Sequence, residues 1–126
     1  MLLIPTKDND RISYAPIVVA EGAFYVIGGY TSFTAHSTIA RLDSTTYEWS
    51  AAGNLLKGRH GHNAIFDGSD IIVVGGYPGN DESVKTEKCT ITEGRVSCVQ
   101  QNPSLVNYSY YPELFLVEDG FCKELP

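Results

Sequence analysis

Two stretches of the sequence decide the fold: Phe24-Tyr25-Val26-Ile27-Gly28-Gly29-Tyr30 and Ile71-Ile72-Val73-Val74-Gly75-Gly76-Tyr77, which begin 47 residues apart. In each stretch a run of four apolar residues, mostly β-branched or aromatic, ends in a double glycine. This pattern is typical of a strand that is buried on both faces and ends where its backbone passes close to a neighbouring segment. Because the motif recurs at a fixed spacing, it predicts a repeat protein.

Shorter runs on either side of each motif predict two β-hairpins per copy. In the first copy these are a strand and a turn at 15–19 and 20–22, then a hairpin made of 37–43 and 47–49. The second copy has the same parts at 62–66, 67–69, 87–91 and 96–98. A third copy begins at 113–117 and 121–122 and stops before a third double glycine. The repeat unit is therefore four antiparallel strands.

The composition agrees with strands and excludes several classes of partner. The 126 residues include 12 Gly and 6 Pro, with many Thr, Tyr, Val and Ile, so we expect an all-β protein. The formal net charge of -6 opposes the phosphate neutralisation on which nucleic-acid binding depends. No apolar run approaches the roughly 18–20 residues that a membrane-spanning helix needs. We expect neither a nucleic-acid partner nor membrane insertion.

The repeat unit resembles the kelch-repeat β-propeller family. The resemblance rests on a double glycine after the second strand, a Tyr-x-Trp on the fourth and an Arg…His before the next first strand. The residues that carry it are Gly28, Gly29, Tyr47, Trp49, Arg59, His62, Gly75 and Gly76. The second copy departs from the pattern, because Val96 and Cys98 stand where Tyr47 and Trp49 stand in the first.

The resemblance implies one partial kelch-repeat domain over residues 1–126, with antiparallel four-stranded blades in an incomplete ring. Blade 1 covers about 12–51, blade 2 about 59–101, and blade 3 starts at about 113–122. Propellers close with four to eight blades, because each blade buries its faces only against its neighbours. We therefore expect the chain to be a fragment of a longer one, to complete a ring with other copies, or to expose two apolar blade faces.

The resemblance also implies a non-enzymatic protein–protein interaction module without a cofactor. Such a module would bind a protein or peptide partner through the long loops on one face, which here are 30–37, 50–58, 77–84 and 101–111. Exposed aromatic side chains anchor interfaces at little entropic cost. The candidate contacts are Tyr30, Phe33, His36, Tyr77, Asn80, Asp81, Tyr108 and Tyr110. The alternative for each tyrosine is that it merely covers the end of a strand.

Two other classes of function stay open. One is a purely structural module of a larger extracellular or cytoskeletal protein. The other is a fragment of a copper oxidase-like propeller, since some kelch-like propellers belong to oxidases that use copper and a cysteine-modified tyrosine.

The cysteine positions predict a disulfide. With a two-residue turn at Glu93-Gly94, Cys89 and Cys98 are direct cross-strand partners at a pair that brings side chains close together. The alternative is that two small apolar residues face each other in a reducing cytosol. Cys122 is left over, and in an oxidised protein it would need a partner elsewhere.

A disulfide favours an extracellular or cell-surface protein, and the sequon Asn107-Tyr108-Ser109 offers a possible glycosylation site in a long loop. A cytoplasmic location remains the alternative, because many kelch-like proteins are intracellular adaptors and the chain shows no signal peptide.

Metal binding is not expected. His60-Gly61-His62 would place two imidazoles on one face of a strand, but a metal site needs further ligands, and the remaining histidine is His36. Asp8-Asn9-Asp10 and Asp81-Glu82 lack the spaced oxygens and the glycine of a calcium loop.

Overall fold

The computed structural model describes residues 2–3, 11–12, 14–31, 34–77 and 86–101. Within these ranges every regular element is a strand, which confirms the all-β prediction. The strands are β1 (Leu2–Leu3), β2 (Arg11–Ile12), β3 (Ile17–Ala20), β4 (Ala23–Ile27), β5 (Tyr30–Thr31), β6 (Thr34–Ala35), β7 (Thr38–Asp43), β8 (Trp49–Asn54), β9 (Asn63–Phe66), β10 (Asp70–Val74), β11 (Glu87–Thr92) and β12 (Arg95–Gln100). No helix in the described residues is long and apolar enough to cross a bilayer.

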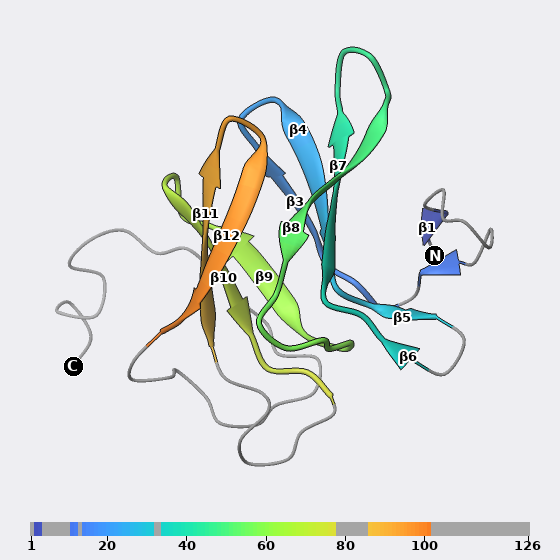
Figure 1. Ribbon diagram of the computed structural model, residues 1–126, viewed down its shortest axis with the longest axis vertical. Helices are drawn as coiled ribbons and strands as arrows, with labels where there is room; N and C mark the ends of the chain where they lie inside the picture. Colours follow the sequence, from blue (N-terminus) through green and yellow to red (C-terminus); the bar gives the residue numbers. More distant parts are fainter. Residues whose placement is uncertain (1, 4–10, 13, 32–33, 78–85, 102–126) are drawn as a thin grey trace, which may run out of the picture.

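The strands form two blades of four, each an antiparallel meander (Figure 1). Blade 1 consists of β3, β4, β7 and β8, and blade 2 consists of β9, β10, β11 and β12. Each predicted double glycine follows the second strand of its blade, β4 or β10. The third blade expected at 113–122 lies outside the described residues, as do Asn107 and Cys122.

The two blades join along one edge and meet again at the other. β8 and β12 pair in parallel, with Val96 opposite Gly53, so that the eight strands form one sheet. A Cβ atom on Gly53 would lie 2.1 Å from the carbonyl oxygen of Val96, so this close approach requires glycine. At the opposite edge β3 lies against β9, which gives a nearly closed barrel with the core inside.

The core lies between the blades and follows from strand alternation. On β3, Val18 and Ala20 are buried, whereas Ile17 and Val19 are exposed. A single cluster of buried residues joins the facing sides of both blades. Its members are Val18, Ala20, Ala23, Tyr25, Ile27, Ile39, Ala52, Leu55, Ile71, Val73, Cys89, Val96 and Cys98. Phe24 differs from the sequence expectation, because it keeps 37% of its surface exposed on the other side of β4.

Short turns and longer connections lie at opposite ends of the blades (Figure 1). The turns at Glu21–Gly22 and Glu93–Gly94 use positive φ at both residues, and Gly68 has a φ of 99° in the third turn. The connections after Gly29 and after Gly76 leave from the other end, which we call the loop end. The described parts of the predicted connections 30–37 and 50–58 therefore lie at the loop end, whereas 78–84 and 102–111 lie outside the described residues.

Two segments assigned to loops contain strands. β8 continues to Asn54, although the sequence places a loop from Ser50 onward, because β7 offers a pairing edge along its whole length. The connection 30–37 contains the two-residue strands β5 and β6, which pair with each other. Local composition misses both features because tertiary pairing overrides weak strand propensity.

A substitution at Gly28 tests whether the double glycine is needed because the two blades approach each other closely there. Its φ is 65°, and an added Cβ would lie 2.8 Å from the carbonyl oxygen of Arg59. Gly22 is a matched control, because its φ is 76° and an added Cβ meets nothing within 4 Å. We expect Gly22→Ala to lower the free energy of unfolding by about 1 kcal/mol through backbone strain alone. Gly28→Ala should lower it by roughly 1–3 kcal/mol more through overpacking. Urea denaturation measures both, and equal losses would contradict the role assigned to Gly28.

Candidate functional site at the loop end

Arg59 connects the two blades at the loop end. Its backbone lies against blade 1, where its carbonyl accepts a hydrogen bond of 2.8 Å from Gly29 N and its N–H donates to His36 O at 3.1 Å. Its side chain lies in blade 2, where Nη1 donates to Gly75 O at 3.2 Å. One residue thus contacts the double glycine of each blade, and only 1% of its surface is exposed.

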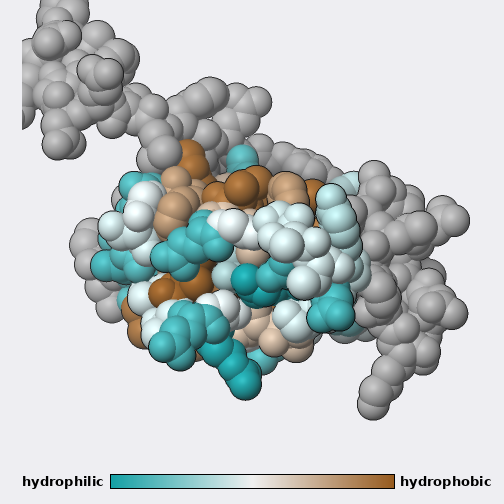
Figure 2. Space-filling model, turned by 90° about the horizontal axis from the view of Figure 1, so that it is seen from above, coloured by the Kyte–Doolittle hydropathy of each residue, from teal (hydrophilic) through white to brown (hydrophobic). Residues whose placement is uncertain are grey.

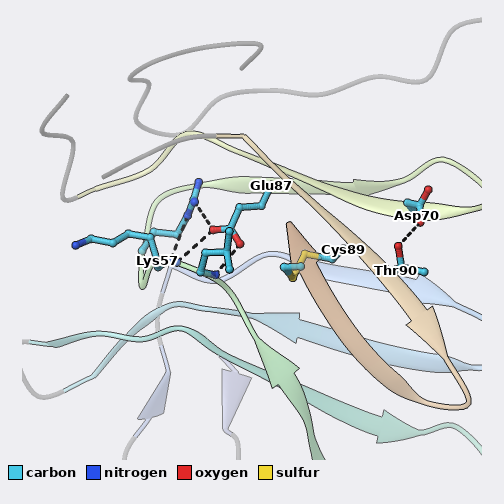
Figure 3. The surroundings of a disulfide bond; sticks show 8 residues. Lys57, Asp70, Glu87, Cys89 and Thr90 are labelled. Carbon is cyan, nitrogen blue, oxygen red and sulfur yellow. Dashed lines mark hydrogen bonds and ion pairs between the residues drawn. A yellow bond between two sulfur atoms is a disulfide. The ribbon is translucent and has the colours of Figure 1, made fainter. Parts of the chain in front are cut away.

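Glu87 neutralises this buried guanidinium. Its Oε2 lies 2.5 Å from Nη2 of Arg59, and both side chains are 1% exposed (Figure 3). The same carboxylate accepts hydrogen bonds from the backbone N–H groups of Leu56 and Lys57, at 2.7 and 3.3 Å. Burial lowers the pKa of Arg59, and the charge of Glu87 opposes that change. The carboxylate of β11 therefore holds Leu56, Lys57 and Arg59 in the connection between β8 and β9.

His62 completes the junction. Its Nε2 lies 2.6 Å from the carbonyl oxygen of Ile27, so in the neutral ring Nε2–H donates to the end of β4. Nδ1 is buried without a hydrogen-bond partner. Burial lowers the pKa of His62 to about 3, and the nearby charge of Arg59 acts in the same direction. At neutral pH His62 is therefore an uncharged packing and hydrogen-bonding residue.

A cluster of aromatic rings surrounds His60, next along the chain from Arg59. The ring centroids of Tyr30, Tyr77 and Tyr14 lie 4.6, 5.6 and 6.0 Å from that of His60. We call these four residues the His60 cluster. Tyr14 and Tyr30 come from blade 1, whereas Tyr77 follows the double glycine of blade 2. The cluster therefore lies where the blades meet.

The backbone fixes the His60 cluster in place. His60 and Tyr77 exchange two main-chain hydrogen bonds of 3.0 and 2.8 Å, and Gly61 N–H donates to Tyr14 O at 3.0 Å. Tyr14 is 55% exposed and Tyr77 50%, while Tyr30 and His60 are half-buried. Burial lowers the pKa of His60, so its imidazole is mainly neutral at neutral pH. It offers rigid, half-exposed aromatic surface with polar edges.

His36 fixes the neighbouring connection, residues 30–37, which contains the β5–β6 hairpin. Its side chain is hydrogen-bonded to Thr31, and its N–H donates to Gly29 O at 2.8 Å. His36 is therefore tied into the β5–β6 hairpin beside the cluster.

The structure describes three of the eight predicted partner contacts, and it brings two of them together. Tyr30 and Tyr77 both contact the ring of His60, and His36 lies in the adjacent hairpin. The other five lie outside the described residues: Phe33, Asn80, Asp81, Tyr108 and Tyr110.

The family-motif residues fall at three places. Gly28, Gly29, Arg59, His62, Gly75 and Gly76 meet at the junction of the blades. Trp49 packs beside Val26 and Ala40 on the side of blade 1 away from blade 2. Tyr47 lies in the β7–β8 turn with a φ of 59° and is 76% exposed.

Sequence reasoning missed Tyr14 and Glu87 and considered His60 only as a metal ligand. The meander topology could have located Tyr14, because a residue just before a first strand lies at the loop end. Glu87 carries no such signal, since a single charged residue at a strand start usually faces solvent. Gly61 has a φ of 69°, which interrupts strand alternation between His60 and His62. The two imidazoles therefore serve separate contacts.

Cys89 and Cys98 form the predicted disulfide, with a Cα–Cα distance of 4.0 Å between directly paired residues (Figure 3). Glu87 lies close by, and its carboxylate and the two sulfurs are within 4.8 Å of one another. The sulfurs are bonded to each other and the carboxylate is paired with Arg59, so this group serves structure in the form described.

Removing Glu87 should be costly, because it leaves the Arg59 charge buried without a partner. We expect Glu87→Ala to lower the free energy of unfolding by about 3–5 kcal/mol in urea denaturation. Lys88→Ala is the matched control, since it removes an ion pair with Asp70 whose lysine side chain is 48% exposed. That substitution should cost at most about 1 kcal/mol. A loss in Glu87→Ala as small as in the control would rule out the structural role of the pair.

The pKa of His62 predicts how stability changes with pH. The folded pKa, about 3, lies below the ordinary value of 6.5, so as pH falls the unfolded chain binds a proton first. The contribution of His62 is therefore complete above pH 6.5 and is lost as pH falls toward 3. We expect a loss of roughly 2 kcal/mol between about pH 6.5 and 4.5.

His62→Gln keeps a side-chain N–H donor without a titrating ring and should reduce that pH dependence. The remaining slope would come mainly from His60, whose pKa is also lowered. The pKa values of Asp43 and Asp67 are lowered from 3.8 by backbone hydrogen bonds, so these groups act below this window. An unchanged slope in His62→Gln would contradict the assignment.

Comparison with known proteins shows which proteins the chain resembles. No family model matches the chain. Kelch-like protein 25 of Homo sapiens is 29% identical over 113 residues, which cover 90% of this chain and 18% of that protein. The Xenopus tropicalis protein of the same name is 34% identical over 76 residues, covering 60% of this chain and 13% of its own length. The chain therefore spans less than a fifth of the length of these curated relatives.

A solved structure supports the fold. The structure of YjhT, a β-propeller, matches with a TM-score of 0.59 at 14% sequence identity and covers 78% of this chain and 33% of its own. The repeated four-stranded blades, the double glycines and these similarities together support a partial kelch-repeat family, and the fold is that of an incomplete β-propeller.

Proposed function

We propose that the chain is a non-enzymatic protein-interaction module that holds a protein or peptide segment at its loop end. The observation that carries the proposal is the His60 cluster, in which three tyrosines surround one imidazole and two of them are about half exposed. Exposed aromatic rings in a fixed arrangement are typical anchors of protein interfaces.

The cluster is suited to binding because its rings are held before a partner arrives. Tyr77 is held by two main-chain hydrogen bonds to His60, and the carbonyl of Tyr14 is held by Gly61. The aromatic rings are therefore already ordered before a partner binds, and this pre-organisation lowers the entropic cost of association. The kelch-like relatives support protein partners in general.

Binding fits the chemistry of this end better than catalysis. The buried charges of Arg59 and Glu87 neutralise each other, and Nε2 of His62 is engaged by Ile27. The polar groups at the junction thus hold the blades together. Phe33, Asn80, Asp81, Tyr108 and Tyr110 belong to the proposed binding face through their positions in the connections of the sequence.

A displayed library of random peptides, selected on the full chain, tests the proposal. We expect Tyr77→Ala and Tyr30→Ala each to weaken the selected peptides by roughly tenfold or more, since truncating an interface anchor costs about 2 kcal/mol. Biolayer interferometry measures the affinities, and thermal melting checks that each variant folds.

Tyr47→Ala is the matched control, because Tyr47 is 76% exposed in a turn at the opposite end of blade 1. It should leave peptide affinity unchanged. Peptides whose binding depends on Tyr47 as strongly as on Tyr77, or on neither, would refute the loop end as the binding face and leave a purely structural module as the better interpretation.

We also propose that the protein works in an oxidising compartment, at the cell surface or outside the cell. The disulfide between Cys89 and Cys98 supports this, because such bonds persist outside the reducing cytosol. In protein from its native source, alkylation before reduction should leave both cysteines unmodified, with Cys122 as an internal comparison. Alkylation of both would favour the cytoplasmic alternative.

A further inference from the structure

The carboxylate of Glu87 and the sulfurs of Cys89 and Cys98 form one buried cluster in blade 2. An oxygen of the carboxylate and both Sγ atoms lie within 4.8 Å of one another. Glu87 and Cys89 are 1 and 0% exposed, and Cys98 is 8% exposed. Glu87 and Cys89 follow each other along the same strand, with the disulfide next to the carboxylate (Figure 3). We call these three residues the β11–β12 cluster.

The hairpin brings the three side chains together without help from the disulfide. Glu87 and Cys89 are two residues apart on β11 and therefore share a face of the strand. Cys98 lies directly opposite Cys89 on β12, at a pair where side chains come closest. Because β11 and β12 pair along their whole length, the backbone keeps this arrangement when the sulfur–sulfur bond is reduced.

Two thiolates and one carboxylate are a ligand set that zinc accepts. In a tetrahedral zinc site, two sulfur ligands lie about 3.8 Å apart, and a sulfur and an oxygen ligand lie about 3.6 Å apart. Reduction frees the sulfurs of Cys89 and Cys98 to rotate about χ1 toward that spacing. Calcium and magnesium prefer oxygen ligands throughout, so the pair of sulfurs selects a thiophilic cation instead.

The charges of the neighbourhood select a divalent cation. One Zn²⁺, two thiolates and the carboxylate of Glu87 carry a net charge of about -1, and the guanidinium of Arg59 beside that carboxylate makes the buried group neutral. Copper(I) would leave one negative charge without a partner in the core, which costs free energy. Zinc therefore fits the charge of this place better than copper(I).

The carboxylate is also oriented in the way that metal ligands usually are. Arg59 and the backbone N–H groups of Leu56 and Lys57 all donate to it. Such outer partners fix the orientation of a ligand and raise the affinity for the metal. They do not occupy the carboxylate fully, because each oxygen has two lone pairs and can accept a hydrogen bond and bind a metal together.

The surroundings of the sulfurs are apolar, unlike much of the molecular surface. Seen from the end of the short turns, polar and weakly hydrophobic residues cover much of the protein, and strongly hydrophobic ones appear mainly along one edge (Figure 2). Cys89 and Cys98 belong to the core between the blades, together with Leu55, Ile71 and Val96. Solvent screens charges weakly in such a core, so the attraction between a cation and two thiolates is strong there.

We propose that the reduced chain binds one Zn²⁺ through Sγ of Cys89, Sγ of Cys98 and a carboxylate oxygen of Glu87. A water molecule takes the fourth position, as in other zinc sites with three protein ligands. A dithiol serves as the reductant. Its two electrons break the bond between the cysteine sulfurs, two zinc–sulfur bonds form, the dithiol becomes a disulfide, and its two protons are released.

The zinc form and the disulfide form exclude each other, because both use the same two sulfurs. An oxidising compartment favours the disulfide, whereas a reducing one that contains zinc favours the metal. The site lies in the core of the hairpin and does not depend on partner binding by the His60 cluster.

Cobalt(II) is the probe for this site, because its visible and near-ultraviolet absorption reports tetrahedral geometry and bound thiolate. The experiment uses the full chain with Cys122→Ser, so that the two cluster cysteines are its only thiols. The chain is reduced with a phosphine that is then removed without oxygen, since a dithiol would itself bind the metal. We expect one equivalent of Co²⁺ to give a tetrahedral thiolate spectrum, which Zn²⁺ abolishes. An identical spectrum from the oxidised chain, or none from the reduced chain, would overturn the proposal.

Glu87→Gln tests the carboxylate, because it keeps the shape of the side chain and removes its charge. Loss of an outer partner weakens metal binding about 10–100-fold, and loss of a ligand should cost at least as much. Competition with a chromophoric chelator measures the affinity for Zn²⁺. Asp70→Asn is the matched control, since Asp70 lies on the adjacent strand and pairs with Lys88 outside the cluster. Equal affinities in the two variants would remove Glu87 from the site.

Two measurements with Glu87 intact decide the question if Glu87→Gln does not fold. Zinc should raise the melting temperature of the reduced chain and leave that of the oxidised chain unchanged, because only a site formed in the folded state stabilises it. X-ray absorption at the zinc edge should show two sulfur ligands, with oxygen in the remaining positions. No rise in melting temperature, or scattering from histidine in place of the two sulfurs, would refute the site.

Discussion

The ion pair between Arg59 and Glu87 determines how the two blades meet. Arg59 is inserted between two double glycines, and its charge can be buried there only because β11 supplies a carboxylate at 2.5 Å. The glycines follow from this, since a Cβ atom on Gly28 would lie 2.8 Å from the carbonyl oxygen of Arg59. The position of His60, and with it the aromatic cluster, depends on the same connection, because His60 is the next residue along the chain.

The sequence predicts the architecture well because its strongest signals are repeated. Periodic apolar runs, short turns with glycine and two double glycines at a fixed spacing indicate four-stranded blades, and the two-residue turn at Glu93-Gly94 aligns Cys89 with Cys98. The continuation of β8 to Asn54 is not visible locally, since its last residues are Gly53 and Asn54 and their pairing comes from β7. Strand ends in this protein are set by the neighbouring strand.

The site is less predictable than the fold for a related reason. Tyr30 and Tyr77 can be identified because each directly follows a double glycine, and the meander places both at one end. Tyr14 and His60 belong to the same cluster, but nothing in their immediate sequence indicates it, because the contacts join residues from two blades. The role of Glu87 is harder still to predict from the sequence. Its counterpart in blade 1 is Thr38, so the repeat does not indicate a buried carboxylate at this position.

The loop-end site depends on both blades. The His60 cluster exists because the tyrosine after each double glycine, Tyr30 or Tyr77, reaches the segment that leads from blade 1 into blade 2. Tyr14, which precedes the first strand of blade 1, contacts the same ring. Neither blade alone supplies all of these rings, so the aromatic surface proposed for binding belongs to the junction between the blades. The contacts that hold this junction together therefore also determine the geometry of the proposed site.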